Sequence, residues 1–363
     1  MINYALLIAV LVSMLLTRLR LPFGSSVSIF VFAIFLLFSP DTGEDYSFYK
    51  EGYEGITFAS AFPFVFGVDS LTVDQGFLWW MGVFKLVFNS YNIFLSLNFI
   101  LAMWFFEYAL KRHYFFKKTD VENLLYLAFP VIIPVAFYWS PRSGPSLIAM
   151  LLLGSTLHSG RFLYSIALAF FAISLHSQYI PNLLGLFVFY YFMAQGARKI
   201  FLLAFGSSLA VMVPLIYGDQ MLAFASLVDG PLRIIFSVAM DKVHYFVDGS
   251  TDGNFRYSFI LILILEIFVM YFIFQDASRV VQDKVIYLLA FSAAFSLVVN
   301  SLFWNSAHLA GRVARFSDWI LATVGVIYLA KKTCPQKLSG LAINFVGVLS
   351  VVVYFGSVYY IKN

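Results

Sequence analysis

Long apolar runs separated by short polar segments cover most of this chain. A helix needs about 20 apolar residues to cross a bilayer, and sometimes as few as about 17. The pattern predicts about twelve membrane-spanning helices, although several of the apolar runs are shorter than this length. The predicted spans are residues 2–17, 24–39, 91–110, 124–140, 144–157, 162–178, 181–195, 200–217, 256–274, 285–303, 318–330 and 339–360. The expected fold is an all-α polytopic membrane protein in which residues 1–363 form a single integral membrane domain.

Composition narrows the class of protein further. The 363 residues are 61% hydrophobic and 12% charged, whereas a soluble domain usually carries about 25% charged residues. A net charge of +4 is too small to indicate binding to nucleic acid. The single cysteine, Cys334, allows neither an internal disulfide nor a cysteine metal cluster. The first apolar run lacks a basic segment and a cleavage site, so we interpret it as a retained span.

The distribution of basic residues predicts which loops face the cytoplasm. Fourteen of the 23 Lys and Arg residues fall in one alternating set of loops, which is therefore assigned to the cytoplasmic side. These loops are residues 17–20, 111–118, 161, 197–199, 275–284 and 331–337. The opposite set then faces outward, together with both chain termini. It contains two long loops, at about 40–90 and 218–255. It also contains Arg142, Arg312 and Arg315, which is unusual because Lys and Arg normally favour the cytoplasmic side.

Two of the outer polar segments lie at the ends of predicted spans. Arg142 precedes Ser143, Gly144 and Pro145, which are typical of a helix start, where backbone N–H groups attract an anion. The alternative is a turn arginine that extends to the membrane surface. His176 ends another span, where an imidazole can donate to a phosphate, transfer a proton, or serve only as a structural residue.

Arg312 and Arg315 form the strongest candidate for an anion site. Their spacing of three residues places both guanidinium groups on one helical face. The planar guanidinium fork matches phosphate oxygens and cannot lose its charge. A surface ion pair between Arg315 and Asp318 is the alternative, and it would leave Arg312 without a partner close in sequence. We therefore expect the two arginines to grip a diphosphate.

The first outer loop combines acids with aromatic residues. Asp45 lies beside Tyr46 and Tyr49, so its carboxylate is a candidate base for a sugar hydroxyl, although an exposed acidic loop would look the same. Further along, Trp79 and Trp80 belong to an aromatic stretch at residues 75–88 that favours an interfacial or re-entrant helix.

The absence of several well-known motifs excludes the common chemistries that depend on them. The chain has no P-loop, no nucleophile elbow and no zinc-binding motif, and no helix carries a carboxylate pair at metal-binding spacing. We therefore expect no metal site and no cofactor. Glu266 lies in the middle of a predicted span and requires a partner inside the helix bundle.

Taken in order, these short motifs resemble the EpsG-like members of the Wzy-type polysaccharide (O-antigen) polymerases. The similarity covers nearly the whole chain. The elements that carry it are Gly43-Glu44-Asp45-Tyr46-Ser47-Phe48-Tyr49, Pro141-Arg142-Ser143-Gly144-Pro145, His176-Ser177-Gln178-Tyr179 and Arg312-Val313-Ala314-Arg315-Phe316. The family often has an Arg before the acidic loop and a Glu-Gly-Tyr after it. This chain has Ser39-Pro40 and Asp74-Gln75-Gly76-Phe77 at those places.

The resemblance implies a GT-C-like helical bundle in the bacterial inner membrane, with its active site facing the periplasm. Its substrates would be polyprenyl (undecaprenyl) diphosphate-linked oligosaccharides, as both donor and acceptor, and a chain-length regulator is a possible protein partner. Arg142, Arg312 and Arg315 would bind the diphosphate with help from His176. Asp45, His176 and Arg142 would be catalytic.

In the same scheme, sugar rings would stack on Tyr46, Tyr49, Trp79 and Trp80.

Two other functions are compatible with the chain. A flippase for the same lipid-linked sugar would require charges deep in the membrane on a path open to both sides. The polar clusters of this chain gather instead on one side, with Glu266 as the deep exception, which favours an enzyme. An O-antigen ligase would use the same diphosphate site, so the residues do not separate it from a polymerase.

Overall fold

The computed structural model describes residues 4–19, 24–38, 44–57, 74–114, 116–130, 132–193, 257–275, 277–302 and 311–362. Throughout these residues every secondary-structure element is helical, as the hydrophobic pattern predicts. The α-helices are α1 (Tyr4–Arg18), α2 (Gly24–Leu37), α3 (Glu44–Gly55), α6 (Gln75–Lys85), α7 (Tyr91–Tyr108), α8 (Lys118–Ala128), α9 (Ser143–His158), α10 (Phe162–Leu175), α11 (Ile180–Met193), α16 (Tyr257–Gln275), α17 (Lys284–Leu302), α19 (Arg315–Ile320), α20 (Val326–Thr333) and α21 (Gln336–Lys362). Short π- and 3-10 helices are η1 (Ala109–His113), η2 (Pro134–Trp139), η3 (Ser177–Tyr179), η5 (Ala277–Val280) and η6 (Leu321–Gly325).

The chain forms two compact units. The first combines Met1–Leu183 with Thr323–Asn363, and the second is Leu184–Ala322. Of the two predicted long loops, residues 40–90 include α3 and α6, which belong to the first unit. The other loop, residues 218–255, and the predicted span 200–217 lie outside the described residues.

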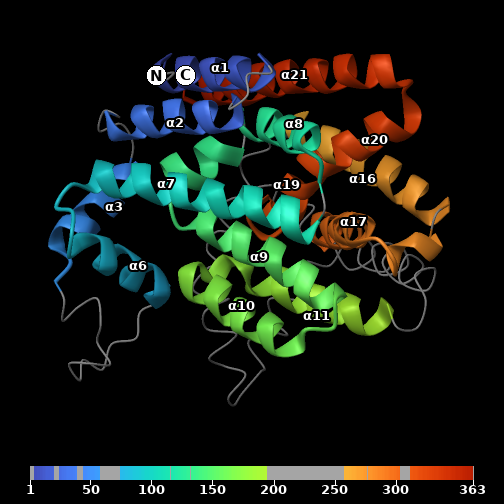
Figure 1. Ribbon diagram of the computed structural model, residues 1–363, viewed down its shortest axis with the longest axis horizontal. Helices are drawn as coiled ribbons and strands as arrows, with labels where there is room; N and C mark the ends of the chain where they lie inside the picture. Colours follow the sequence, from blue (N-terminus) through green and yellow to red (C-terminus); the bar gives the residue numbers. More distant parts are fainter. Residues whose placement is uncertain are drawn as a thin grey trace, which may run out of the picture. The chain divides into compact units, whose positions relative to one another are not determined.

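The first unit is a series of packed helices that can be followed in Figure 1. Helix α1 pairs with α2, α2 packs on α7, α7 contacts α9, and α9 lies along α10. Helix α6 packs against α10, and α3 contacts both α6 and α7. This arrangement brings the two helices of the first predicted outer loop beside the ends of α9 and α10.

Polar residues lie at both ends of helix α9 in the first unit. It begins directly after Arg142, while near its other end the Ser155 hydroxyl lies 3.4 Å from Nδ1 of His113 in η1. The 16 residues of α9 span about 24 Å. At the η1 end lie basic residues of the loops assigned to the cytoplasm, because α8 packs against η1 and its Asp120 pairs with Lys331 at 2.5 Å. The outer-loop residues gather at the other end.

The helices differ in how readily they could cross a bilayer. Tyr91–His113 has 23 residues and is long and apolar enough to span by length and composition, the one such helix among the described residues. Other apolar helices of 10–17 residues include Tyr4–Arg18, Phe162–Leu175 and Leu338–Val353. Large apolar side chains are exposed along several of them, for example Leu163 and Phe170 on α10. Exposed apolar faces of this kind are what a lipid environment covers.

One predicted span is divided in the structure. The apolar run at 124–140 was expected as a single helix, but α8 ends at Ala128 and the π-helix η2 begins only at Pro134. Pro130 and Pro134 explain the division, because proline lacks the N–H that a continuous helix needs and its ring clashes with the preceding turn.

In the second unit, α17 packs against both α16 and α19. A Cβ added at Gly185 of α11 would lie 2.5 Å from the ring of Phe295 in α17, so the two helices approach closely there. The predicted span at 318–330 corresponds to the consecutive helices α19, η6 and α20, of which α19 belongs to the second unit and α20 to the first.

Candidate functional site

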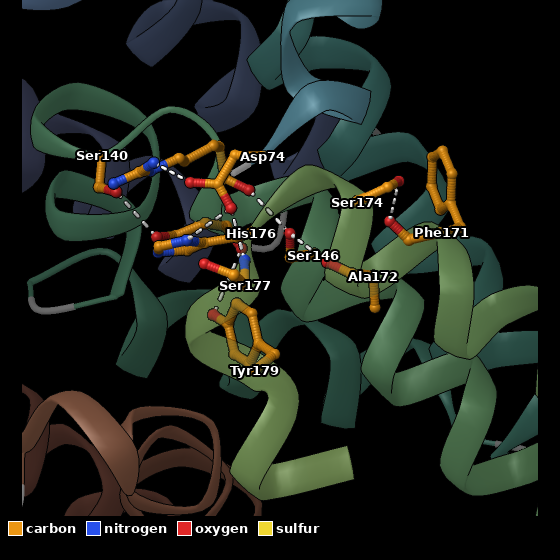
Figure 2. A network of polar contacts seen from close by, with 11 residues as sticks. Asp74, Ser140, Ser146, Phe171, Ala172, Ser174, His176, Ser177 and Tyr179 are labelled. Atoms are coloured by element: carbon orange, nitrogen blue, oxygen red, sulfur yellow. Dashed lines mark hydrogen bonds and ion pairs between the residues drawn. The ribbon is translucent and has the colours of Figure 1, made fainter. Parts of the chain in front are cut away.

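Three segments that are far apart in the sequence meet at Asp74 in the first unit (Figure 2). Asp74 directly precedes α6, Arg142 directly precedes α9, and His176 connects α10 to η3. Arg142 and His176 were both predicted site residues, whereas Asp74 was noted in the sequence only as a departure from the family pattern. The structure therefore joins two predicted residues through an acid that was not predicted.

The Asp74 carboxylate collects three contacts. Its Oδ2 forms an ion pair with a terminal nitrogen of Arg142. Its Oδ1 accepts a hydrogen bond from the backbone N–H of Ser177 at 2.5 Å and lies 3.8 Å from Nδ1 of His176. The side chains of Asp74 and His176 are only 9% and 6% exposed, so these charges interact with little screening by water.

Electrostatics keep Asp74 ionised. Burial acts to raise the pKa of this carboxyl, but His176, the Arg142 charge and the Ser177 N–H favour the ionised form and together lower the pKa below its ordinary value. A carboxyl with a lowered pKa stabilises the fold above its unfolded pKa, and this stabilisation is lost as the pH falls through the folded pKa. The Asp74 carboxyl is therefore ionised at neutral pH, and its contribution to stability is lost only in acid.

The backbone around Asp74 holds its side chain in place. Asp74 has φ 70° and ψ 31°, a left-handed conformation that only a few non-glycine residues adopt, Asp and Asn among them. Although it occupies the N-cap position of α6, its carboxylate makes no capping hydrogen bond to that helix. Two residues later, a Cβ on Gly76 would lie 2.3 Å from Oγ of Ser174 and 2.9 Å from its backbone carbon. The start of α6 is thus packed tightly against the end of α10, next to His176.

Two hydrogen bonds to backbone carbonyls hold the turn that carries Arg142. The Asn98 amide donates to the carbonyl of Pro141 at 3.1 Å, and the Ser146 hydroxyl donates to the carbonyl of Arg142 at 3.0 Å. The prediction that a helix starts at Ser143 is confirmed by α9. The Arg142 side chain is 30% exposed, its guanidinium carbon lies 5.6 Å from the Tyr49 ring centre, and its buried Nε has no hydrogen-bond partner among the described residues. The guanidinium therefore keeps donor capacity beyond its pair with Asp74.

His176 ends α10 as the sequence predicts and is 4% exposed. Its ring meets that of Tyr179 edge-on, with 5.7 Å between the ring centres. The Tyr179 hydroxyl in turn donates to the carbonyl of Ser143 at 3.4 Å. These contacts connect the turn after α10 to the start of α9, so the three segments form one structural cluster.

The aromatic residues predicted to stack on sugars occupy different environments. Tyr46 is 3% exposed and donates to Asn92, while Tyr49 is 8% exposed and lies under Arg142. Trp80 is partly exposed and donates to Asn98 at 2.8 Å, and Trp79 is also partly exposed. Asp45 lies in the first turn of α3. Helix α6 places both tryptophans on the same short element that Asp74 precedes.

Arg312 and Arg315 belong to the second unit. Both are partly buried, and the helical path bends at Ala314 between them, so the predicted continuous helical face is interrupted. Arg315 begins α19, where its guanidinium carbon lies 6.0 Å from the Trp319 ring centre. Asp318, considered above as a surface partner for Arg315, is 9% exposed and accepts a hydrogen bond from Ser296 at 2.5 Å.

The partner that Glu266 requires inside the bundle is Asn300. The Asn300 amide of α17 donates to Oε1 of Glu266 in α16 at 2.8 Å and to Oγ of Ser296 at 3.2 Å. Because Ser296 also donates to Asp318, the four buried side chains form a chain of polar contacts across α16, α17 and α19.

An apolar chain whose described residues form only helices, with an acid–arginine–histidine cluster, has the features of a membrane protein that carries a polar functional site. Comparison with known families agrees with this class. The EpsG family matches residues 23–363, and the chain belongs to that family. Membership supports polysaccharide biosynthesis with a polymerase-type function, and it is consistent with a membrane protein. No curated protein and no solved structure matches the chain.

Proposed function

We propose that this protein is a bacterial inner-membrane glycosyltransferase. It polymerises polyprenyl diphosphate-linked oligosaccharide repeat units into O-antigen or another envelope polysaccharide on the periplasmic face. The match of the EpsG family over residues 23–363 is the observation that carries the proposal. The cluster of Arg142 and His176 around Asp74 supports it, because it joins an anion-binding side chain to one that can transfer a proton.

In the proposed reaction an acceptor sugar hydroxyl attacks the anomeric carbon of the donor glycan. A new carbon–oxygen bond forms, the bond from the anomeric carbon to the diphosphate oxygen breaks, and the polyprenyl diphosphate leaves with the electron pair. The hydroxyl proton passes to a general base, a step that typically contributes about 10²–10⁴-fold to the rate. His176 and Asp45 are the candidate bases.

The leaving diphosphate gathers negative charge as the bond breaks, and fixed cations that meet this charge lower the barrier. Arg142 in the first unit and, separately, the pair Arg312 and Arg315 in the second unit are the candidates for this role, and the proposed reaction then requires no metal ion. The fork of a guanidinium offers two parallel N–H groups to phosphate oxygens. Trp79 and Trp80, which are partly exposed, would border the path of the glycan, where aromatic faces pack on sugar rings. Tyr46 and Tyr49 are buried and do not offer a face to a sugar in this structure.

Reconstitution tests this function directly. Purified protein in liposomes, supplied with lipid-linked repeat units, is expected to produce longer lipid-linked glycans without another protein, and to do so equally well in a chelator. Products are resolved by the number of repeats. Movement of the lipid-linked unit across the bilayer without elongation would identify a flippase instead. Transfer of finished glycan to a different lipid without elongation would identify a ligase.

A further inference from the structure

The Asp74 carboxylate lies between the two candidate residues of the first unit and has no role in the reaction as proposed so far. It approaches His176 at Nδ1, at 3.8 Å, and pairs with Arg142 on its other oxygen. A carboxylate at Nδ1 favours the tautomer that carries a proton there, which leaves Nε2 as the nitrogen that can accept one. Both ring nitrogens are buried, so Nε2 meets the acceptor hydroxyl only when the substrate displaces the side chains that cover it. It also stabilises the imidazolium that forms when Nε2 takes a proton.

We propose that Asp74 is a positioning residue: it holds the His176 imidazole and the Arg142 guanidinium in the geometry in which Nε2 of His176 receives the acceptor hydroxyl proton. The inference rests on the proposed function and deepens it, because it selects His176 rather than Asp45 as the base. During the step the proton moves from the sugar hydroxyl to Nε2, the hydroxyl oxygen bonds to the anomeric carbon, and the polyprenyl diphosphate departs.

The Asp74 carboxylate could instead act as a plug that fills the anion site until a substrate displaces it. Asp74 accepts from Arg142 and from the Ser177 N–H, so it occupies a place that a substrate phosphate could take, and it would then be a plug that the substrate displaces. The packing opposes a plug. The backbone that carries Asp74 is held in a left-handed conformation, and Gly76 leaves no space between α6 and α10, so the start of α6 cannot move away from His176.

The balance of charge around His176 also favours a positioning role for Asp74. Asp74 places a charge 3.8 Å from His176 and is itself paired with Arg142, while the ring of Tyr179 meets the imidazole edge-on. The Asp74 and Arg142 charges balance before the reaction. When His176 accepts the proton, the cluster gains one positive charge beside a carboxylate, in a place with little water. That charge lies where it can also attract the departing diphosphate.

The experiment measures kcat, KM for the lipid-linked donor, and the pH profile of elongation in liposomes for Asp74→Asn. The asparagine preserves shape and one acceptor oxygen but removes the negative charge. We expect kcat to fall by about 10²-fold or more, with little change in KM. Because the imidazole becomes harder to protonate without the carboxylate charge, the acid limb of the profile is expected to move to lower pH.

Two further variants sharpen the result. Asp74→Glu restores the charge with an added methylene, so the acid limb should return towards its original pH while kcat stays reduced. Asp120→Asn is the matched control: Asp120 is a buried acid of the same unit that pairs with Lys331 at the other end of α9, and its kcat should remain near that of the unaltered protein. Thermal unfolding of each purified variant separates loss of activity from loss of fold.

Several outcomes would overturn the inference. Unchanged kcat with a lower KM in Asp74→Asn would identify a plug, and a reduced kcat with an unmoved acid limb would identify a purely structural role. In both cases the unaltered protein still elongates glycans and the proposed function stands. If the unaltered protein does not elongate, the proposed function and the inference fail together.

Discussion

Replacing Arg142 with alanine is expected to reduce elongation by about 10²–10³-fold, the usual effect of removing one donor that stabilises charge in a transition state. The guanidinium is the charged donor of the Asp74 cluster, and it is partly exposed, so a substrate phosphate can reach it. Arg142→Lys should recover little activity, because an ammonium is a point charge without the parallel donors of a guanidinium. The initial rate of repeat addition in liposomes measures both effects.

Arg142→Ala is also expected to destabilise the first unit, because it leaves the Asp74 charge buried without its partner. Breaking a fully buried pair costs about 3–5 kcal/mol and an exposed pair about 0–1 kcal/mol. With side chains 30% and 9% exposed, this pair should fall between those limits. Adding Asp74→Asn removes the uncompensated charge, so the double variant should regain thermal stability while elongation remains low. Recovery of elongation together with stability would contradict a direct role for Arg142.

The second large effect is expected at Arg312 and Arg315. Each alanine variant should lower elongation by about 10²–10³-fold while the protein stays folded and reaches the membrane in normal amount. Arg279→Ala is the matched control in the same unit, because Arg279 is an exposed arginine that lies near Asp283 in a loop assigned to the cytoplasm. Full activity in both Arg312→Ala and Arg315→Ala would end the proposal that this pair grips the diphosphate.

Hydrophobic pattern and local motifs predicted much of the architecture. The all-helical class follows from apolar runs, and the start of α9 at Ser143 and the end of α10 before His176 follow from polar residues at their edges. The need for a partner at Glu266 follows from the cost of an isolated acid among apolar residues, and Asn300 meets that need. Each of these features depends on residues close together in the chain.

Asp74 was not predicted as a site residue for a physical reason. Its partners Arg142 and Ser177 lie 68 and 103 residues away, and no periodic pattern connects residues at such separations. The presence of an aspartate in a polar loop also does not reveal that its backbone is left-handed. The available signal was an acid in the first outer loop that directly precedes an aromatic helix, at the place where the family often has Glu-Gly-Tyr. The carboxylate is retained there, and the structure shows what it contacts.

The division of the predicted span at 124–140 was also not predicted from the hydrophobic pattern. The run is apolar enough for one helix, and hydropathy alone does not register that Pro130 and Pro134 interrupt the backbone hydrogen bonds. The resulting π-helix η2 contacts the start of the chain segment that carries Arg142: a Cβ added at Gly144 would lie 2.1 Å from the ring of Phe137. Glycine at this position thus allows α9 to begin close to η2.

The central claim is that the Asp74 cluster acts in a transfer from a polyprenyl diphosphate. Its most direct test is the amount of polyprenyl diphosphate released by purified protein in liposomes, measured together with the number of repeat units added. We predict one released carrier for every glycosidic bond formed, and loss of both products together in Arg142→Ala and His176→Ala. Elongation at an unchanged rate in these two variants, or elongation without release of the carrier, would contradict it.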